Sequence, residues 1–138
     1  MNKTKITVET MISADVRKVW TYFTTPRHIT NWNFASDDWL CPQAENDLRV
    51  GGKLRSRMEA KDGSFGFDFE AIYDEVIEHK KITYTMTDGR LAETNFENHD
   101  GKIKVSITFD AEHENSVDLQ RAGWQAILEN FMKYVEAN

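Results

Sequence analysis

The chain has 138 residues, a length that fits one domain, which we expect to span residues 1–138. Hydrophobic residues make up 40% of it and charged residues 29%, a balance typical of globular proteins and not of disordered ones. Lys and Arg total 17 against 23 Asp and Glu, and the resulting formal net charge of −6 argues against nucleic-acid binding, which uses a basic surface.

Membrane insertion and secretion are also disfavoured. The longest stretch without Asp, Glu, Lys or Arg is nine residues, 28–36, whereas a membrane span needs roughly 20 apolar residues. The N-terminus lacks the apolar segment and cleavage site of a signal peptide. The single cysteine, Cys41, has no partner for an internal disulfide, so we expect a cytoplasmic protein with no membrane partner.

The first expected elements are a strand and two short helices. Ile6 and Val8 share one face of the opening strand, with polar residues between them. Ser13 is a candidate N-cap for a helix over roughly 14–24. Pro26 is expected to open a second short helical turn that runs through Trp32.

A run of about five antiparallel strands is expected next. Asp-Gly pairs at 62–63, 88–89 and 100–101 predict hairpin turns between segments of alternating apolar and polar residues. In residues 64–73, Phe67 and Phe69 share one face, and Asp68 and Glu70 share the other. Residues 59–78 hold seven acids and one base, which indicates a solvated sheet face or, alternatively, a docking surface for a basic protein partner.

The C-terminal residues, from about 116 to 136, predict one long helix. Its expected inner stripe is Leu119, Gly123, Ile127, Phe131 and Tyr134 or Val135, with Trp124 and Leu128 beside it. Glycine disfavours a helix interior, so Gly123 predicts a close approach of the helix to a neighbour. An antiparallel sheet must cover its apolar face, and only this helix is large enough. The predicted fold class is therefore α+β, with a curved antiparallel sheet wrapped around the long C-terminal helix.

Patterns for catalysis and metal binding are weak. The four histidines lack metal-ligand spacing, and no glycine motif for phosphate or dinucleotide binding is present, so we expect no metal and no cofactor. One polar constellation, His28, Asp37, Asp38 and Cys41, lies in the segment before the sheet. A buried carboxylate there would be a candidate general acid. We regard His28 and Asp38 as weak catalytic candidates, because nothing in the sequence brings them together.

Aromatic residues are the stronger signal. They make up 12% of the chain, and Trp32, Phe34 and Trp39 crowd into an otherwise polar segment. They form either ordinary core or the wall of a pocket between the sheet and the C-terminal helix, and pocket and core use the same residue types. The residues predicted to line such a pocket are Trp32, Phe34, Trp39, Met58, Phe67, Phe69, Tyr84 and Trp124.

Short motifs occur in a fixed order along nearly the whole chain. They are Val19-Trp20, Thr25-Pro26-x-x-Ile29-x-x-Trp32, Trp39-x-x-Pro42, Arg49-Val50-Gly51-Gly52, Phe67-x-Phe69-x-x-x-Tyr73, Asp88-Gly89-Arg90 and Gln120-Arg121-x-Gly123-Trp124. This ordered set resembles the family of homologues of the activator of the heat-shock-protein-90 ATPase, in the START-like or SRPBCC superfamily. The resemblance implies a helix-grip fold with a cavity between sheet and helix that often receives an apolar ligand.

Three functions follow from these expectations. We favour a small-molecule binding protein whose ligand is apolar or amphipathic. The resemblance also implies a cochaperone-like regulator of a heat-shock chaperone ATPase. In the eukaryotic activator a separate N-terminal domain precedes this one, and this chain has no room for it, so we expect little or no stimulation by this chain. The resemblance implies a third function, because the superfamily also contains enzymes of the cyclase or hydratase kind, which would use the same cavity.

Overall fold

A computed structural model describes residues 4–138, and the structural statements below concern that part of the chain. Seven strands and three helices occur in it. In chain order they are β1 (Lys5–Ile12), α1 (Val16–Thr24), α2 (Pro26–Ile29), β2 (Trp39–Asn46), β3 (Lys53–Ala60), β4 (Gly66–Ile77), β5 (Lys81–Met86), β6 (Leu91–His99), β7 (Lys102–Asp110) and α3 (Val117–Ala137).

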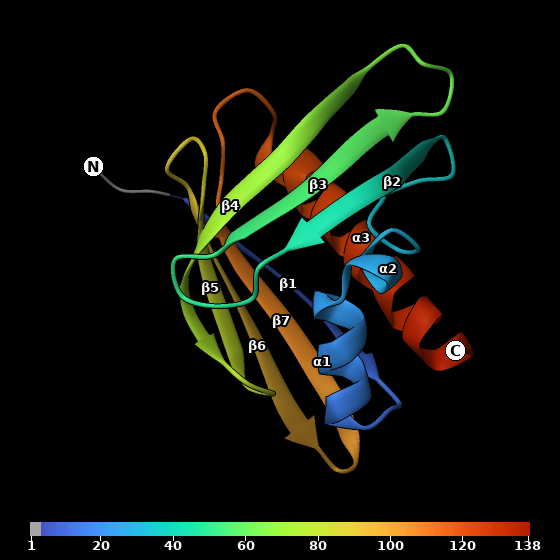
Figure 1. Ribbon diagram of the computed structural model, residues 1–138, viewed down its shortest axis with the longest axis vertical. Coiled ribbons are helices and arrows are strands. Elements are labelled where there is room, and N and C mark those ends of the chain that lie inside the picture. Colours follow the sequence, from blue (N-terminus) through green and yellow to red (C-terminus); the bar gives the residue numbers. More distant parts are fainter. Residues whose placement is uncertain (1–3) are drawn as a thin grey trace.

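The strands form one antiparallel sheet that curls around α3 (Figure 1). Its spatial order is β1-β7-β6-β5-β4-β3-β2, so β1 and β2 are the two edges. The helix α3 crosses the concave side and has its closest backbone contacts with β1 and α1, whereas the β3–β4 hairpin extends beyond it (Figure 1). This is the helix-grip arrangement that the sequence predicts.

The hydrophobic core lies between the concave face and α3. Alternate residues of β1 point inward, and Ile6, Val8 and Ile12 are buried, as the alternation predicts. Phe109 of β7 and Phe131 of α3 are fully buried against them. Burying one such side chain contributes about 1.5–3 kcal/mol, so this layer holds the helix on the sheet.

The start of α1 differs from the prediction. Asp15, not Ser13, is the N-cap, and its side chain accepts a hydrogen bond from the Arg17 N–H at 2.8 Å. The backbone N–H of Ser13 instead donates to the carboxylate of Glu136 near the end of α3, at 2.9 Å. Ser13 therefore helps to attach the C-terminal turns of α3, and the cap moves two residues along the chain.

The strand β2 occupies a segment in which the sequence predicted no strand. It shows no regular alternation, because Pro42 interrupts it and its pairing with β3 shifts between Leu40 and Gln43. Proline and bulges are tolerated on edge strands, where one side of the backbone is unpaired. The same two features hide β2 from periodicity analysis.

The buried face of α3 matches the predicted stripe at Phe131 and Val135 and departs from it in the N-terminal turns of the helix. Leu119 is 60% exposed, although the pattern placed it inside. Gly123 also fails as a contact point, since nothing lies within 4 Å of a β-carbon built on it. The residues that are buried on α3 are Gln120, Leu128, Phe131 and Val135. Neither α3 nor any other helix within residues 4–138 is long and apolar enough to cross a bilayer.

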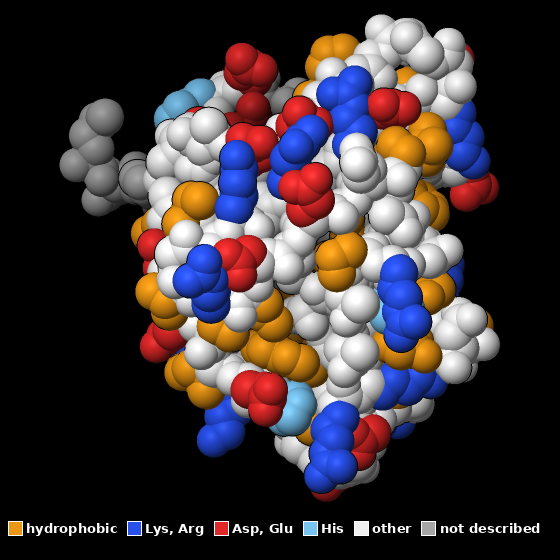
Figure 2. Space-filling view, in the orientation of Figure 1, with side chains coloured by type: hydrophobic (Ala, Val, Ile, Leu, Met, Phe, Trp, Pro, Cys, Tyr) orange, Lys and Arg blue, Asp and Glu red, His pale blue; other side chains and the backbone are white. Residues whose placement is uncertain are grey.

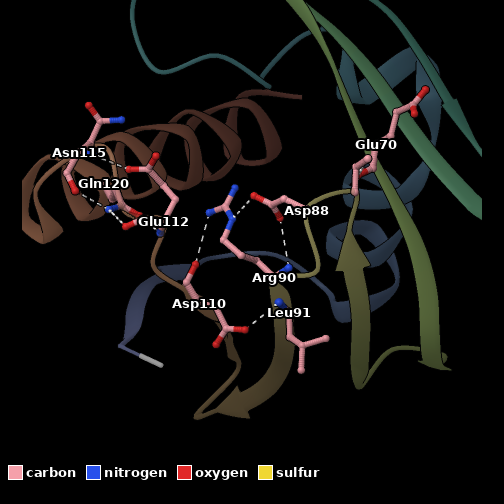
Figure 3. Close-up of polar contacts among 9 residues, drawn as sticks. Glu70, Asp88, Arg90, Leu91, Asp110, Glu112, Asn115 and Gln120 are labelled. Atoms are coloured by element: carbon pink, nitrogen blue, oxygen red, sulfur yellow. Dashed lines mark hydrogen bonds and ion pairs between the residues drawn. The ribbon is translucent and has the colours of Figure 1, made fainter. Parts of the chain in front are cut away.

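Gln120 replaces Leu119 on the inner face because its amide is fully used. Its Oε1 accepts from the Glu112 N–H at 2.9 Å, and its Nε2 donates to the carbonyls of Glu112 at 3.2 Å and Asn115 at 2.8 Å (Figure 3). Buried polar groups are tolerated when they are hydrogen-bonded in this way. Gln120 thus anchors the loop that leads into α3.

A second glutamine of α3 reaches the edge of the sheet. The Nε2 of Gln125 donates to the carbonyl of Glu9 in β1 at 3.0 Å. Its Oε1 accepts from the N–H of Glu9 at 3.4 Å. One side chain therefore satisfies both backbone groups of an edge residue.

Candidate functional site

Aromatic side chains run along the concave face from β2 to β5. In the β3–β4 register, Phe67 faces Met58 and Phe69 faces Ser56, and both β3 partners are buried on the concave side. Phe67 nevertheless remains 42% exposed, and Phe69 is half-buried. We call the following five residues the aromatic strip: Trp39, Phe65, Phe67, Phe69 and Tyr84.

Ring contacts divide the aromatic strip into two groups, Trp39 with Phe65 and Phe67, and Phe69 with Tyr84. The Trp39 ring centroid lies 6.1 Å from that of Phe65 and 6.2 Å from that of Phe67. Phe69 meets Tyr84 edge-on at 6.0 Å. These separations are typical of interacting aromatic pairs. Phe65 and Phe67 remain 60% and 42% exposed, so this end of the aromatic strip is largely uncovered.

Tyr84 also belongs to a row of residues across the sheet. It pairs with Ala92 of β6, and Ala92 pairs with Phe109 of β7. Trp124 of α3 stacks on Phe109 with ring centroids 3.9 Å apart. Tyr84 and Phe109 therefore flank the small side chain of Ala92, and Trp124 of α3 covers the Phe109 end of this row.

Trp32 is placed in the core and not in the aromatic strip. It is 6% exposed and contacts Phe23 at 5.4 Å and Phe131 at 4.8 Å between ring centroids. Its indole N–H donates to the carbonyl of Tyr22 at 3.0 Å. These contacts fit the core interpretation that the sequence left open for Trp32.

Phe34 and Met58 lie beside the loop that follows α2. Phe34 is half-buried, and its carbonyl accepts a hydrogen bond from Asn130 of α3 at 2.5 Å. Met58 is 8% exposed, and its sulfur lies 3.7 Å from the amide nitrogen of Asn33. The eight predicted lining residues are thus divided between the core, this loop and the aromatic strip.

The weak catalytic candidates, His28 and Asp38, are not brought together. The Nδ1 of His28 lies 2.7 Å from the Tyr134 hydroxyl, and its ring stacks on Tyr22 at 3.9 Å. Burial, reinforced by the neighbouring positive charge of Arg27, lowers the pKa of His28. Asp38 is exposed and accepts a hydrogen bond from the Ser36 hydroxyl. No hydrogen bond or ion pair connects the two within residues 4–138, so they form no acid–base pair.

Cys41 and Asp37 complete the polar constellation without forming a site. Cys41 is 2% exposed, and burial raises the pKa of its thiol, although hydrogen bonding by Asn33 opposes the change. A buried, protonated thiol is a poor nucleophile. Asp37 is exposed. Within residues 4–138, no group of three or more His, Cys, Asp or Glu side chains is arranged to hold a metal ion.

The acidic run on β4 is largely paired with basic residues of β3. Arg57 lies 3.5 Å from Asp68, and Lys53 lies 3.3 Å from Glu70. Basic and acidic side chains accordingly interleave over the outer face of β3 and β4 (Figure 2). A shallow hollow of about 540 Å³ lies on this face, lined by Pro42, Gln43, Arg55, Arg57, Glu59 and Asp68. This face is a mixed-charge surface, and none of the predicted ligand residues lines its hollow.

Sequence reasoning missed a polar cluster around Arg90 (Figure 3). Arg90 ends the turn between β5 and β6, where its carbonyl accepts from the Met86 N–H at 2.7 Å. Its Nε donates to Asp88 at 2.7 Å, and its Nη1 donates to the carbonyl of Asp110 at 3.3 Å. The guanidinium lies between these two aspartates (Figure 3). In the sequence, the Asp88-Gly89-Arg90 motif predicted only a turn, and Gly89 indeed has φ +89°.

The two aspartates beside Arg90 have further stabilising contacts. Partial burial opposes ionisation of Asp88, but hydrogen bonds from Arg90 prevail and lower the pKa of Asp88. Asp110 is 1% exposed, and its carboxylate accepts from Lys5 Nζ at 2.5 Å and from the Leu91 N–H at 2.9 Å. These contacts hold the end of β7 and the β5–β6 turn in place.

Comparisons with known proteins agree with the fold. The family model for Activator of Hsp90 ATPase homolog 1-like protein matches residues 13–136. No curated protein matches the sequence. The solution structure of an AHSA1-like protein from Aeromonas hydrophila is 41% identical, with a TM-score of 0.91, and the match covers 97% of this chain and 93% of that one.

Two further solved structures extend the comparison. A solution structure from Cytophaga hutchinsonii is 44% identical, with a TM-score of 0.84, over 97% of this chain and 93% of that one. A crystal structure from Chromobacterium violaceum shares the fold at 21% identity, with a TM-score of 0.86, over 98% of this chain and 99% of that one.

Proposed function

The chain belongs to the Activator of Hsp90 ATPase homolog 1-like family. We propose that it binds small apolar or amphipathic molecules between the concave sheet face and α3. The observation that carries the proposal is the aromatic strip. Phe65 and Phe67 are 60% and 42% exposed, and they continue into the half-buried Phe69 and Tyr84 on the inner side of the sheet. Sites for small ligands are typically concave and lined by aromatic side chains with a few polar groups.

Binding at the strip would draw its affinity mainly from apolar burial. Each Å² of apolar surface removed from water contributes about 25 cal/mol, less the loss of freedom on binding. The ligand that this surface favours has a flat or flexible apolar part long enough to cross several rings.

The test uses anilinonaphthalene sulfonate, an apolar fluorescent probe, with variants on the two faces of β4. We expect the wild type to enhance probe fluorescence and Phe69→Ala to weaken the apparent affinity about fivefold or more, because the ring is a large part of the strip. Ile72→Ala is the matched control, since Ile72 is 43% exposed and lies on the opposite face of the same strand. Native mass spectrometry of freshly purified protein checks for a bound apolar molecule.

The outcomes separate a binding surface from plain packing. Equal affinities for Phe69→Ala and Ile72→Ala, with both variants folded by thermal unfolding, would place the probe elsewhere. A wild-type protein that neither binds the probe nor retains a molecule would overturn the proposal.

Cochaperone-like regulation is the second candidate, and the family description favours it. Docking through an acidic face has less support, because Asp68 and Glu70 are paired with Arg57 and Lys53. A saturable, several-fold rise in the ATPase turnover of the ninety-kilodalton heat-shock chaperone would rank this candidate first. Little or no stimulation is expected if ligand binding is the main function.

A further inference from the structure

Arg90 and Tyr84 lie on the concave side of neighbouring strands. Tyr84 pairs with Ala92, and the backbone bond from Met86 to Arg90 places Arg90 opposite Met86. Met86 and Ala92 are both buried in the core, so all four side chains share one face. The positive charge of Arg90 also acts on the Tyr84 phenol, where it opposes the effect of burial.

Both residues retain hydrogen-bond donors without acceptors. A guanidinium carries five N–H donors. Arg90 uses Nε for Asp88 and one Nη1 donor for Asp110, while Nη2 has no acceptor within residues 4–138. No hydrogen bond within residues 4–138 involves the Tyr84 hydroxyl, and because no buried side-chain oxygen there lacks a partner, this hydroxyl is accessible to solvent. Burial raises the pKa of Tyr84, so at neutral pH its hydroxyl is protonated and able to donate.

The carboxylates nearby do not use up these donors. Asp110 is held by Lys5 and by the backbone of Leu91. Asp88 takes only the Nε donor, and its side chain is 55% exposed. A planar guanidinium with a free edge suits a carboxylate, which accepts two parallel hydrogen bonds.

Apolar surface begins directly beside these donors. The Tyr84 ring contacts Phe69 at 6.0 Å. Phe67 continues the strip along β4, about 6.6 Å farther at two residues of strand rise. A ligand with an acidic head at Arg90 would therefore lay its tail over the aromatic strip.

We propose that Arg90 and the Tyr84 hydroxyl form an anion anchor at one end of the aromatic strip, and that the ligand is an amphipathic carboxylic acid. This proposal rests on the proposed function, because it names the ligand class of the same surface. Arg90 supplies charge and two donors, Tyr84 supplies one donor, and the rings bind the tail.

The test compares decanoic acid with decan-1-ol, which share a ten-carbon tail and differ in the head group. At pH 7 the acid is ionised. We expect titration calorimetry to show that the wild type binds decanoate about tenfold more tightly than decanol, the size of one charge-assisted hydrogen bond. Arg90→Gln should remove this preference and change the decanol affinity less than twofold. Tyr84→Phe, which deletes only the hydroxyl, should reduce the decanoate affinity about threefold.

Controls keep the result specific to the anchor. Arg49→Gln makes the same charge change at an exposed arginine whose partner is Asp47, and it should leave both affinities unchanged. Arg90→Lys keeps the charge and should retain part of the acid preference. Thermal unfolding confirms that each variant is folded. If Arg90→Gln does not fold, the loss of decanoate affinity in Tyr84→Phe tests the anchor.

The outcomes distinguish the anchor from the binding surface. Equal wild-type affinities for acid and alcohol, or an acid preference that survives in both Arg90→Gln and Tyr84→Phe, would overturn the anchor and leave the proposed function standing. Failure to bind either probe would overturn the proposed function together with the anchor.

Discussion

His28 is held between aromatic side chains from two helices. Its ring stacks on Tyr22 of α1, and its Nδ1 lies 2.7 Å from the hydroxyl of Tyr134 in α3. Arg27 precedes His28 in α2. The ammonium group of Lys18 lies over the Tyr22 ring, 5.5 Å from its centroid. A positive charge on the His28 ring would therefore lie near two other cations, Lys18 of α1 and Arg27 of α2. The neutral imidazole fits this position best.

Protonation of His28 should destabilise the folded chain. The ordinary pKa of histidine is 6.5, and burial with Arg27 lowers the pKa of His28 below it. Between the two values the unfolded chain binds more protons, so stability rises with pH through this window and falls as pH drops. We expect urea unfolding at pH 7.5 and 5.5 to show a smaller loss of stability for His28→Gln than for the wild type.

An exposed histidine provides the comparison for this measurement. His99 lies 3.1 Å from Glu97 on the surface, and His99→Gln should keep the pH dependence attributed to His28. The same loss of stability in the wild type and in His28→Gln would contradict a role for His28.

Local residue patterns determine which face of a regular strand is buried, whereas contacts between distant residues determine the buried face of α3. The alternation in β1 and β7 follows from which face is buried, and residue order alone shows it. The sequence does not predict β2, because Pro42 and the register shift after Leu40 remove the alternation of buried and exposed residues. The face of α3 is set by Gln120, whose partners Glu112 and Asn115 precede the helix. Residue polarity gives no sign of that contact.

Gly123 should limit the stability of α3. Alanine is favoured over glycine in a helix interior by about 1 kcal/mol, and a β-carbon at this position meets no atom within 4 Å. Gly123→Ala should therefore raise the free energy of urea unfolding by about 1 kcal/mol. A decrease would mean that α3 approaches a neighbour after all.

Gly52 provides the opposite case in the same experiment. A β-carbon there would lie 2.0 Å from the carbonyl oxygen of Asp47, so the backbone would have to move. Gly52→Ala should lower stability, and similar effects of the two alanine variants would contradict this difference in environment.

Across the whole molecule, the two ends of the concave face are filled differently. The end covered by α1 holds interlocked rings, such as Trp32 on Phe131 and Phe23 on Phe96. The end under the β3–β4 hairpin carries Phe65 and Phe67 with much of their surface exposed. The sequence could not separate core from site, because both use large aromatic residues. Arg90 was not predicted as a site residue, because only the pairing of β5 with β6 places it on the same face as Tyr84.

Truncating an aromatic side chain should cost more unfolding free energy at the core end of the concave face than at the hairpin end. Phe131 is fully buried, so Phe131→Ala should lower the free energy of unfolding by about 3–5 kcal/mol. Phe65 is 60% exposed, so Phe65→Ala should change it by about 0.5 kcal/mol or less. Chemical denaturation of both variants measures the contrast, and comparable losses would show that the hairpin end is packed like the core.

The edges of the sheet determine how folded copies meet one another. An unprotected edge strand invites a neighbouring molecule to add its own strand, the first step toward fibrils. On β1, Gln125 already occupies both backbone groups of Glu9. On β2, Pro42 offers no N–H, and the bulge beside it distorts the pairing surface. Self-templated growth is therefore hindered at both ends of the sheet, and the protein can display an apolar strip at high concentration without joining sheet to sheet.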